Sequence, residues 1–218
     1  MMRKQLHERQ LQTVREISIA LGEKDSYTQA HGHRVAIYAM RLAERVGFSP
    51  HGARDVGIGG LFHDVGKLAL SDRIFTARHT RLSNDLKQEV RCHPLIGAAL
   101  IKNIAFLEPA VDFVLFHHER EDGNGYPFGL KSEEIPPGAK IVSIADCFDA
   151  VTTDRPYNRG QPVESAFEIL REGCRCFFCE AYVAAFIEEI EENGMIQEIG
   201  PNALFADRLI QSAAGDAL

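Results

Sequence analysis

Residues 49–67 read SPHGARDVGIGGLFHDVGK, and this stretch decides how the chain is expected to fold. Ser49 and Pro50 are typical of a helix cap and a first helical position, and the segment after them predicts a helix that runs to about His63. His63 and Asp64 stand next to each other where that helix should end. The stretch therefore predicts a helix whose last turn presents two side chains that can bind metal ions.

Helical periodicity continues on both sides of this stretch. Apolar residues recur at steps of three and four along residues 4–22, and again from a cap at residues 24–26 to Gly47. Further helices are expected over residues 84–92, 94–104, 109–117, 138–152, 163–172 and 180–192, with a weaker one near the C-terminus. Alternating strand patterns are almost absent, so the predicted fold class is all-α. Residues 119–137 form a long loop rich in glycine and proline, and such a loop is more often functional than filler.

Composition restricts the kind of partner and the compartment. The chain has 218 residues, of which 45% are hydrophobic and 25% charged, and this fits one globular domain. The net charge of −7 argues against binding a nucleic-acid polymer, because that affinity comes largely from neutralising many phosphates. The sequence contains no run of about 18 apolar residues, so no membrane span is predicted. The N-terminus lacks the apolar stretch of a signal peptide. The five cysteines form no framework pattern, so the expected compartment is the cytoplasm.

A second adjacent pair, His117 and His118, stands at another predicted helix end, directly before the loop. Neighbouring helical residues point about 100° apart, so one pair does not easily serve a single metal ion but can serve two that lie about 3.5–4 Å apart. His31, His93 and Asp146 could complete a mixed nitrogen and oxygen ligand set, which suits iron, manganese or zinc. Each residue alone has an ordinary structural explanation, whereas together they favour a binuclear metal centre.

Four segments match the motifs of a known family, in the same order. Residues 63–67, HDVGK, resemble the HDxGK signature of HD-domain phosphohydrolases, and residues 117–127, HHEREDGNGYP, resemble the HHExxDGxGYP segment that names the HD-GYP family. Residues 25–35, DSYTQAHGHRV, are similar to its DxYTxxHxxRV opening, and residues 145–157 contain its ADxxDA and DRPY elements. The resemblance implies a single HD-type helical bundle with a glycine- and proline-rich GYP loop. The expected division is an N-terminal helix at 1–23, a catalytic domain at 24–200 and a C-terminal tail or helix at 201–218.

The same resemblance implies roles for individual residues. One divalent metal ion would be held by His31, His63, Asp64 and Asp146, and a second by His93, His117 and His118, with Asp64 bridging the two. Iron or manganese is expected, and the hydroxide generated between the two ions would attack the phosphorus. Asp64 and Lys67 are the implied catalytic residues. Lys67, Tyr126 and Arg155 are the implied substrate contacts.

The implied activity is hydrolysis of cyclic di-GMP to pGpG, to GMP or to both. The alternatives are a related substrate, such as cyclic GMP-AMP or a mononucleotide phosphoester, and a catalytically weak sensor that binds the dinucleotide and signals through a partner protein. A plain structural helical domain is the third alternative. Tyr27 stands where some members carry a glutamate ligand, which predicts two metals and not three, and Asn158 replaces a residue that is often basic. Residues 1–23 are expected to pack along the domain, to join two chains in a homodimer, or to serve as a linker helix that passes on a signal.

Overall fold

The computed structural model describes residues 2–24, 26–76, 83–154, 159–196 and 203–216, and within these ranges it contains helices and isolated β-bridges but no strand. In chain order the elements are α1 (Met2–Lys24), α2 (Ser26–Arg45), α3 (Pro50–Phe62), η1 (Val65–Ala69), α4 (Asp72–Thr76), α5 (Asn84–Arg91), α6 (His93–Ile101), η3 (Ala105–Ala110), α7 (Val111–Phe116), η4 (Ser132–Glu134), α8 (Pro137–Thr152), α9 (Val163–Glu172), α10 (Glu180–Asn193) and α11 (Ala203–Asp216). The predicted all-α fold class is confirmed.

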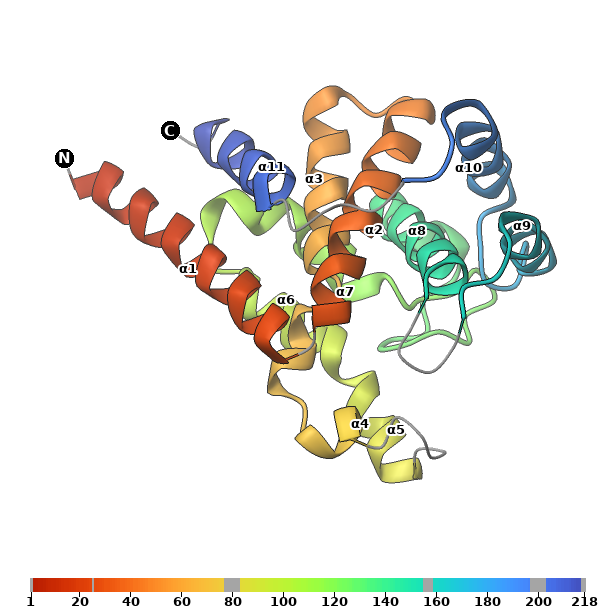
Figure 1. Cartoon of the computed structure of the whole chain (residues 1–218), viewed down its shortest axis with the longest axis horizontal. Helices are drawn as coiled ribbons and strands as arrows, with labels where there is room; N and C mark the ends of the chain where they lie inside the picture. The colour runs from red at the N-terminus through yellow and green to blue at the C-terminus, as the bar shows by residue number, and fades with distance from the viewer. Residues whose placement is uncertain (1, 25, 77–82, 155–158, 197–202, 217–218) are drawn as a thin grey trace.

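Helices α2 and α3 form the centre of the molecule, and α8 packs against both (Figure 1). A glycine on α3 allows the close approach, because a β-carbon at Gly60 would lie 3.1 Å from the Ala36 backbone on α2. Ser49 caps α3 as predicted, since its Oγ accepts a hydrogen bond of 3.1 Å from the Gly52 N–H. His63 follows as the C-cap of α3. The close packing of α3 against α2 therefore determines the position of His63, the first candidate ligand after α3.

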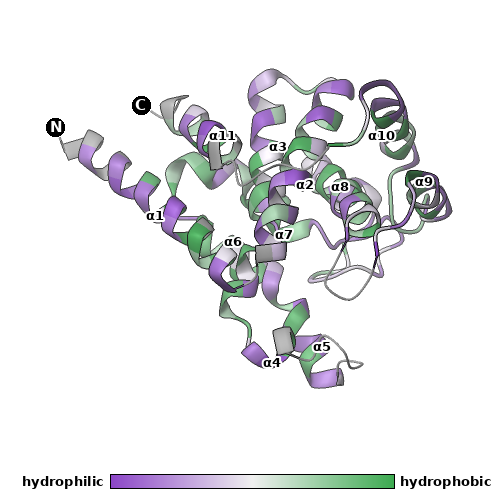
Figure 2. Ribbon diagram, viewed as in Figure 1, coloured by the Kyte–Doolittle hydropathy of each residue, from purple (hydrophilic) through white to green (hydrophobic). Residues whose placement is uncertain are grey.

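Two apolar clusters lie on either side of this centre. One joins α2 and α8 to α9 and α10, and in it Tyr38, Phe148 and Phe186 meet edge to face with ring centroids 5.0 to 6.0 Å apart. The other joins α3 to η3 and α11, and it also receives α1 through Val14. In Figure 2, α1 carries both hydrophilic and hydrophobic residues along its length.

The predicted helix boundaries hold to within a few residues, with differences around Pro109. The helix expected over residues 94–104 ends at Ile101, and the 3-10 helix η3 follows it. Proline has no N–H for the α-helical ladder, so Pro109 lies inside η3 and α7 begins at Val111. The sequence does not predict α4, because five residues are too few to show a helical period.

Both ends of the described chain form helices that pack on the second cluster. On α1, the Lys24 ammonium donates to the carbonyls of Leu68 and Leu70 at 2.9 and 2.7 Å, which ties the helix to the segment at η1. The C-terminal segment forms α11, with Leu209 in the interior. The division of the chain at residues 23 and 200 stays a prediction. Within the described ranges, no helix combines the length and the apolar character needed to cross a bilayer.

Candidate metal centre

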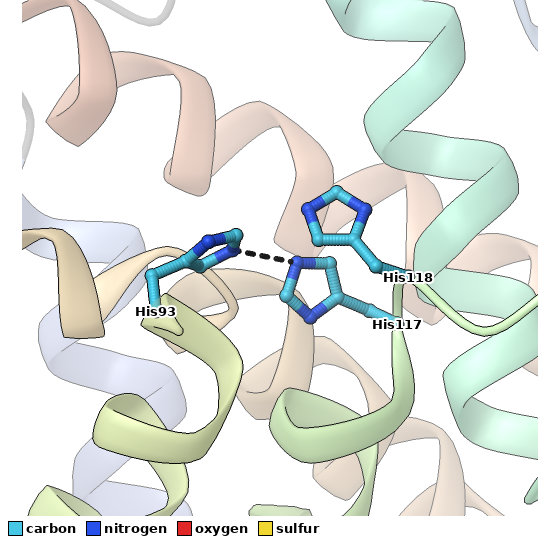
Figure 3. Close-up of side chains that lie close together, drawn as sticks. All are labelled: His93, His117 and His118. Carbon is cyan, nitrogen blue, oxygen red and sulfur yellow. Dashed lines mark hydrogen bonds between the residues drawn. The ribbon is translucent and has the colours of Figure 1, made fainter. Parts of the chain in front are cut away.

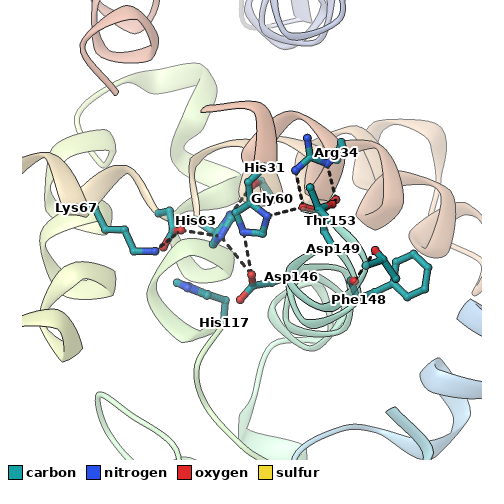
Figure 4. A network of polar contacts seen from close by, with 12 residues as sticks. His31, Arg34, Gly60, His63, Lys67, His117, Asp146, Phe148, Asp149 and Thr153 are labelled. Atoms are coloured by element: carbon teal, nitrogen blue, oxygen red, sulfur yellow. Dashed lines mark hydrogen bonds and ion pairs between the residues drawn. The ribbon is translucent and has the colours of Figure 1, made fainter. Parts of the chain in front are cut away.

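The seven predicted ligands come from five helical elements and converge on one place. His31 lies on α2, His63 and Asp64 lie between α3 and η1, His93 begins α6, His117 and His118 follow α7, and Asp146 lies on α8. Figure 4 shows His31, His63, His117 and Asp146 facing a common space, and Figure 3 shows His93 reaching toward the 117–118 pair. The ring centroids of the neighbouring histidines lie 4.0 to 5.3 Å apart. Segments that are distant in sequence therefore form one cluster.

Three of these histidines share one orientation. In each, Nδ1 lies within hydrogen-bond distance of the backbone carbonyl three residues earlier. The distances are 2.7 Å for His63 and Gly60, 2.7 Å for His93 and Val90, and 2.8 Å for His117 and Val114. A carbonyl only accepts, so Nδ1 must carry the proton, and in a neutral ring Nε2 is then an acceptor. The backbone thus directs three unprotonated nitrogens into the cluster, as it does for many metal-binding histidines.

In the neutral rings, the Nε2 atoms that face into the cluster carry no proton and so cannot donate hydrogen bonds to one another. Nε2 of His93 and Nε2 of His117 lie 3.3 Å apart (Figure 3), although both are acceptors in the neutral rings. Nε2 of His63 is buried and has no hydrogen-bond partner in the described part of the chain. Burial and neighbouring positive charge hold the pKa of His117 well below its usual range, and burial lowers the pKa of His118 to about 3. His93, His117 and His118 all have a pKa lowered by burial, and such neutral, buried rings fit a cation between them.

Asp64 lies between the two halves of the cluster. Its Oδ2 is 3.3 Å from Nε2 of His63, and its Oδ1 is 3.3 Å from Nε2 of His93. Burial opposes the charge on this carboxylate, but Lys67, His63 and His93 outweigh burial and hold the pKa of Asp64 well below its usual value. The Lys67 ammonium donates to Oδ2 of Asp64 at 2.5 Å. One ionised carboxylate thus faces both groups of histidines, as a bridging ligand would.

His31 is held differently, by two carboxylates of α8. Nε2 lies 3.0 Å from Oδ1 of Asp146, and Nδ1 lies 2.7 Å from Oδ2 of Asp149. Burial alone would lower the pKa of His31, but the hydrogen bonds with Asp146 and Asp149 raise it to about 9. Arg34 donates to both oxygens of Asp149 at 2.6 and 2.9 Å, and Tyr27 stacks on His31 at 5.8 Å. The sequence gives no role to Asp149, although it stands three residues after Asp146 and so shares its helix face.

The described residues contain two groups of potential metal ligands. Within each group, the donor atoms all lie within 4.8 Å of one another. The groups are His31, His63 and Asp64, and His93, His117 and His118. They coincide with the two ligand sets that the family resemblance implies, and Asp146 adds an oxygen 3.8 Å from Nε2 of His63. Imidazole and carboxylate donors without thiolate suit iron, manganese or zinc. The residues present therefore fit a pair of divalent cations.

The GYP loop closes one side of the cluster. The Tyr126 ring lies 4.7 Å from the His118 ring. The backbone N–H of Tyr126 donates to the backbone carbonyl of His118 at 3.1 Å. Glu119 is buried, and its carboxylate accepts hydrogen bonds from three backbone N–H groups of the loop. The donors are Phe128 at 2.7 Å, Gly129 at 3.2 Å and Leu130 at 2.9 Å. The sequence motif contains Glu119 but does not reveal this function. The predicted substrate contact Arg155 and the atypical Asn158 lie outside the described residues.

Comparison with known proteins identifies the family. The HD domain family matches residues 12–175, so the chain belongs to it. The chain is 34% identical over 178 residues to a cyclic di-GMP phosphodiesterase of Thermotoga maritima, an alignment that covers 80% of this chain and 48% of that protein. It is 30% identical to the 3'3'-cGAMP-specific phosphodiesterase 3 of Vibrio cholerae, over 68% of this chain and 32% of that protein. The predicted relation to the HD-GYP family is confirmed.

The fold agrees with that of a solved structure. An HDG"Y"P protein from Bdellovibrio bacteriovorus superimposes with a TM-score of 0.60 at 22% identity, over 75% of this chain and 52% of that one. At this identity the likeness shows the fold alone. The chain spans about half, or less, of the length of the curated relatives cited here.

Proposed function

We propose that this protein is a metal-dependent phosphodiesterase that opens cyclic di-GMP and releases pGpG, GMP or both. The observation that carries the proposal is the convergence of the acceptor nitrogens of His63, His93 and His117 around the ionised Asp64. A buried set of nitrogen and oxygen donors suits two divalent cations, with iron or manganese expected. The relatives that bear cyclic-dinucleotide phosphodiesterase names supply the substrate class.

Two divalent cations bound here would polarise a phosphate and make a nearby water acidic enough to attack it near neutral pH. The chain's own residues prepare the site for this chemistry. Backbone carbonyls fix the imidazole rings, and Asp64 faces both ligand groups. Lys67 brings a positive charge beside Asp64, where the phosphate would gain negative charge in the transition state. Burial raises the pKa of Tyr126, so its phenol stays protonated and can donate to the substrate.

Cyclic GMP-AMP is the second candidate substrate, because relatives at 28 to 31% identity bear the name of 3'3'-cGAMP-specific phosphodiesterases. A cluster that binds phosphate does not by itself distinguish the two bases of a dinucleotide. The sensor alternative keeps the same pocket but lacks turnover. A homodimer through residues 1–23, a signalling partner and a substrate contact by Arg155 belong to this proposal as predictions.

The test is turnover by the whole chain, prepared without oxygen and loaded with iron or manganese. Cyclic di-GMP, cyclic GMP-AMP and mononucleotide phosphoesters are compared by chromatography. Opening of cyclic di-GMP is expected, and Asp64→Ala should abolish it because the shared carboxylate is gone. Tyr126→Ala should mainly weaken substrate binding. Unchanged turnover in Asp64→Ala would refute the mechanism, and tight binding without product across several metals would favour the sensor.

A further inference from the structure

Arg91 lies beside the candidate centre and has no role in the proposal above. It is the last residue of α5, and its guanidinium carbon lies 5.0 Å from the centre of the Tyr126 ring. The Tyr126 ring lies 4.7 Å from the ring of the candidate ligand His118. The neighbouring Val90 carbonyl holds Nδ1 of His93 at 2.7 Å. The backbone that carries Arg91 is therefore the same backbone that orients a candidate ligand.

Among the residues that the structure describes, none neutralises the charge of Arg91. Its side chain is exposed, and no carboxylate pairs with it in the described ranges of the chain. Arg34, Arg45 and Arg120, in contrast, each pair with a carboxylate. The helix dipole favours a cation at any helix C-terminus, so the position of Arg91 at the end of α5 does not by itself indicate a binding site. What distinguishes Arg91 is that it contacts Tyr126, which itself contacts the cluster.

The loop backbone that carries the Tyr126 ring is held in place by several contacts. Tyr126 is tied to the His118 carbonyl through its N–H. A β-carbon at the preceding Gly125 would lie 2.5 Å from the Cα of Glu119, so the loop backbone is already in close contact there. The Glu119 carboxylate then fixes the loop beyond Tyr126 through three backbone N–H groups. The loop backbone at Tyr126 and the end of α5, on which Arg91 lies, are therefore each placed by contacts within the fold.

We infer that Arg91 binds the phosphate of the cyclic dinucleotide that is not being cleaved. The inference rests on the proposed function and adds a second anchor for the same substrate. A cyclic dinucleotide has two phosphodiesters, and the cluster with Lys67 serves only the one under attack. The guanidinium packs on the Tyr126 ring, which packs on the ring of the candidate ligand His118, so a single side chain separates Arg91 from the cluster. Its planar fork matches two phosphate oxygens.

The experiment compares two substrates with the whole chain loaded with manganese. Cyclic di-GMP has two phosphodiesters, whereas bis(p-nitrophenyl) phosphate has one. In Arg91→Ala, KM for cyclic di-GMP is expected to rise about tenfold with little change in kcat, because a charge-assisted contact is lost. Both parameters for the small diester should stay at their wild-type values. Arg91→Lys should recover part of the loss, since lysine keeps the charge but not the fork.

Arg171→Ala is the matched control, because Arg171 is also exposed and its guanidinium carbon lies 5.8 Å from the Phe167 ring on α9. This variant should leave all parameters unchanged. A salt series then separates a phosphate contact from a base contact. The rise of KM with ionic strength should be shallower in Arg91→Ala than in the wild type, because one screened charge contact is gone.

Three results would overturn the inference: an unchanged KM for cyclic di-GMP, an equal loss on both substrates, or a raised KM with the wild-type salt dependence. The last result would assign Arg91 to a base and not to a phosphate. The proposed function is tested separately by the wild type. A wild-type protein that cleaves the small diester but neither binds nor opens cyclic di-GMP would refute both claims, whereas wild-type turnover that does not depend on Arg91 refutes this one alone.

Discussion

At the scale of single residues, the candidate centre combines side chains that lack a proton with one, His31, whose pKa, in spite of burial, Asp146 and Asp149 raise to about 9. Burial lowers the pKa of His118 to about 3 and holds that of His117 lower than usual, so both rings are neutral and able to bind a metal ion. The pKa of Asp64 is lowered in spite of burial, because Lys67 and His63 lie beside it. Neutral imidazoles and an ionised carboxylate are the protonation states that metal ligation requires, so His31 would have to release a proton to a bound cation.

Asp149 is expected to contribute directly to the free energy of unfolding. Its carboxylate is 1% exposed and pairs with both His31 and Arg34. Asp149→Ala should lower the free energy of unfolding by about 3 kcal/mol, because it leaves a largely buried arginine without its partner. Urea unfolding measures this. Arg34→Met combined with Asp149→Ala should recover part of the loss, and additive losses would contradict the pairing.

At the scale of elements, the GYP loop is organised by one buried carboxylate. Glu119→Ala would leave the N–H groups of Phe128, Gly129 and Leu130 without their acceptor. We expect faster proteolysis within residues 123–131 and a KM for cyclic di-GMP several-fold higher, because Tyr126 is no longer held. Glu119→Gln should fall between the wild type and Glu119→Ala in both measurements, since its side chain keeps one acceptor oxygen. The exposed Glu133 provides the control, and a Glu119→Ala loop as resistant as that of Glu133→Ala would contradict this function.

The contact between η1 and α6 is equally specific. A β-carbon at Gly66 would overlap the His93 carbonyl and lie 2.7 Å from the Gly97 nitrogen. Gly66→Ala should therefore push η1 away from α6, lower the free energy of unfolding by about 2 kcal/mol or more, and weaken metal binding by separating Asp64 from His93. Gly57→Ala is the milder comparison, because its nearest neighbours would lie at 3.3 Å. Calorimetric unfolding and metal titration that rank the two variants equally would contradict this packing.

At the scale of the whole molecule, the cluster links five helical elements that are far apart in sequence. Bound cations would stabilise the native state over the unfolded chain. Manganese at about a hundredfold excess over its dissociation constant should add about 2.7 kcal/mol, which is several degrees in the unfolding midpoint for a chain of this size. Thermal unfolding with manganese and with a chelator tests this. Asp64→Asn should show a smaller shift, and equal shifts in the two proteins would place the metal elsewhere.

The sequence is sufficient to predict those parts of the molecule that depend on local pattern. The cap at Ser49, the helix end at His63 and the adjacent pair at 117–118 are all visible in the chain, and the structure brings these ligands together. The functions of Glu119 and Arg91 are not predictable in this way. They depend on where a loop and the end of α5 meet in three dimensions, and no spacing along the chain encodes that contact.

The central claim is that two ligand groups that share Asp64 each hold one cation. Equilibrium dialysis against manganese, with metal analysis of the folded protein, counts the ions directly. The wild type should bind two per chain. His117→Ala should retain one, because the group that contains His31 and His63 is intact. A wild-type protein that binds one ion or none, or a His117→Ala variant that still binds two with unchanged affinity, would contradict the account.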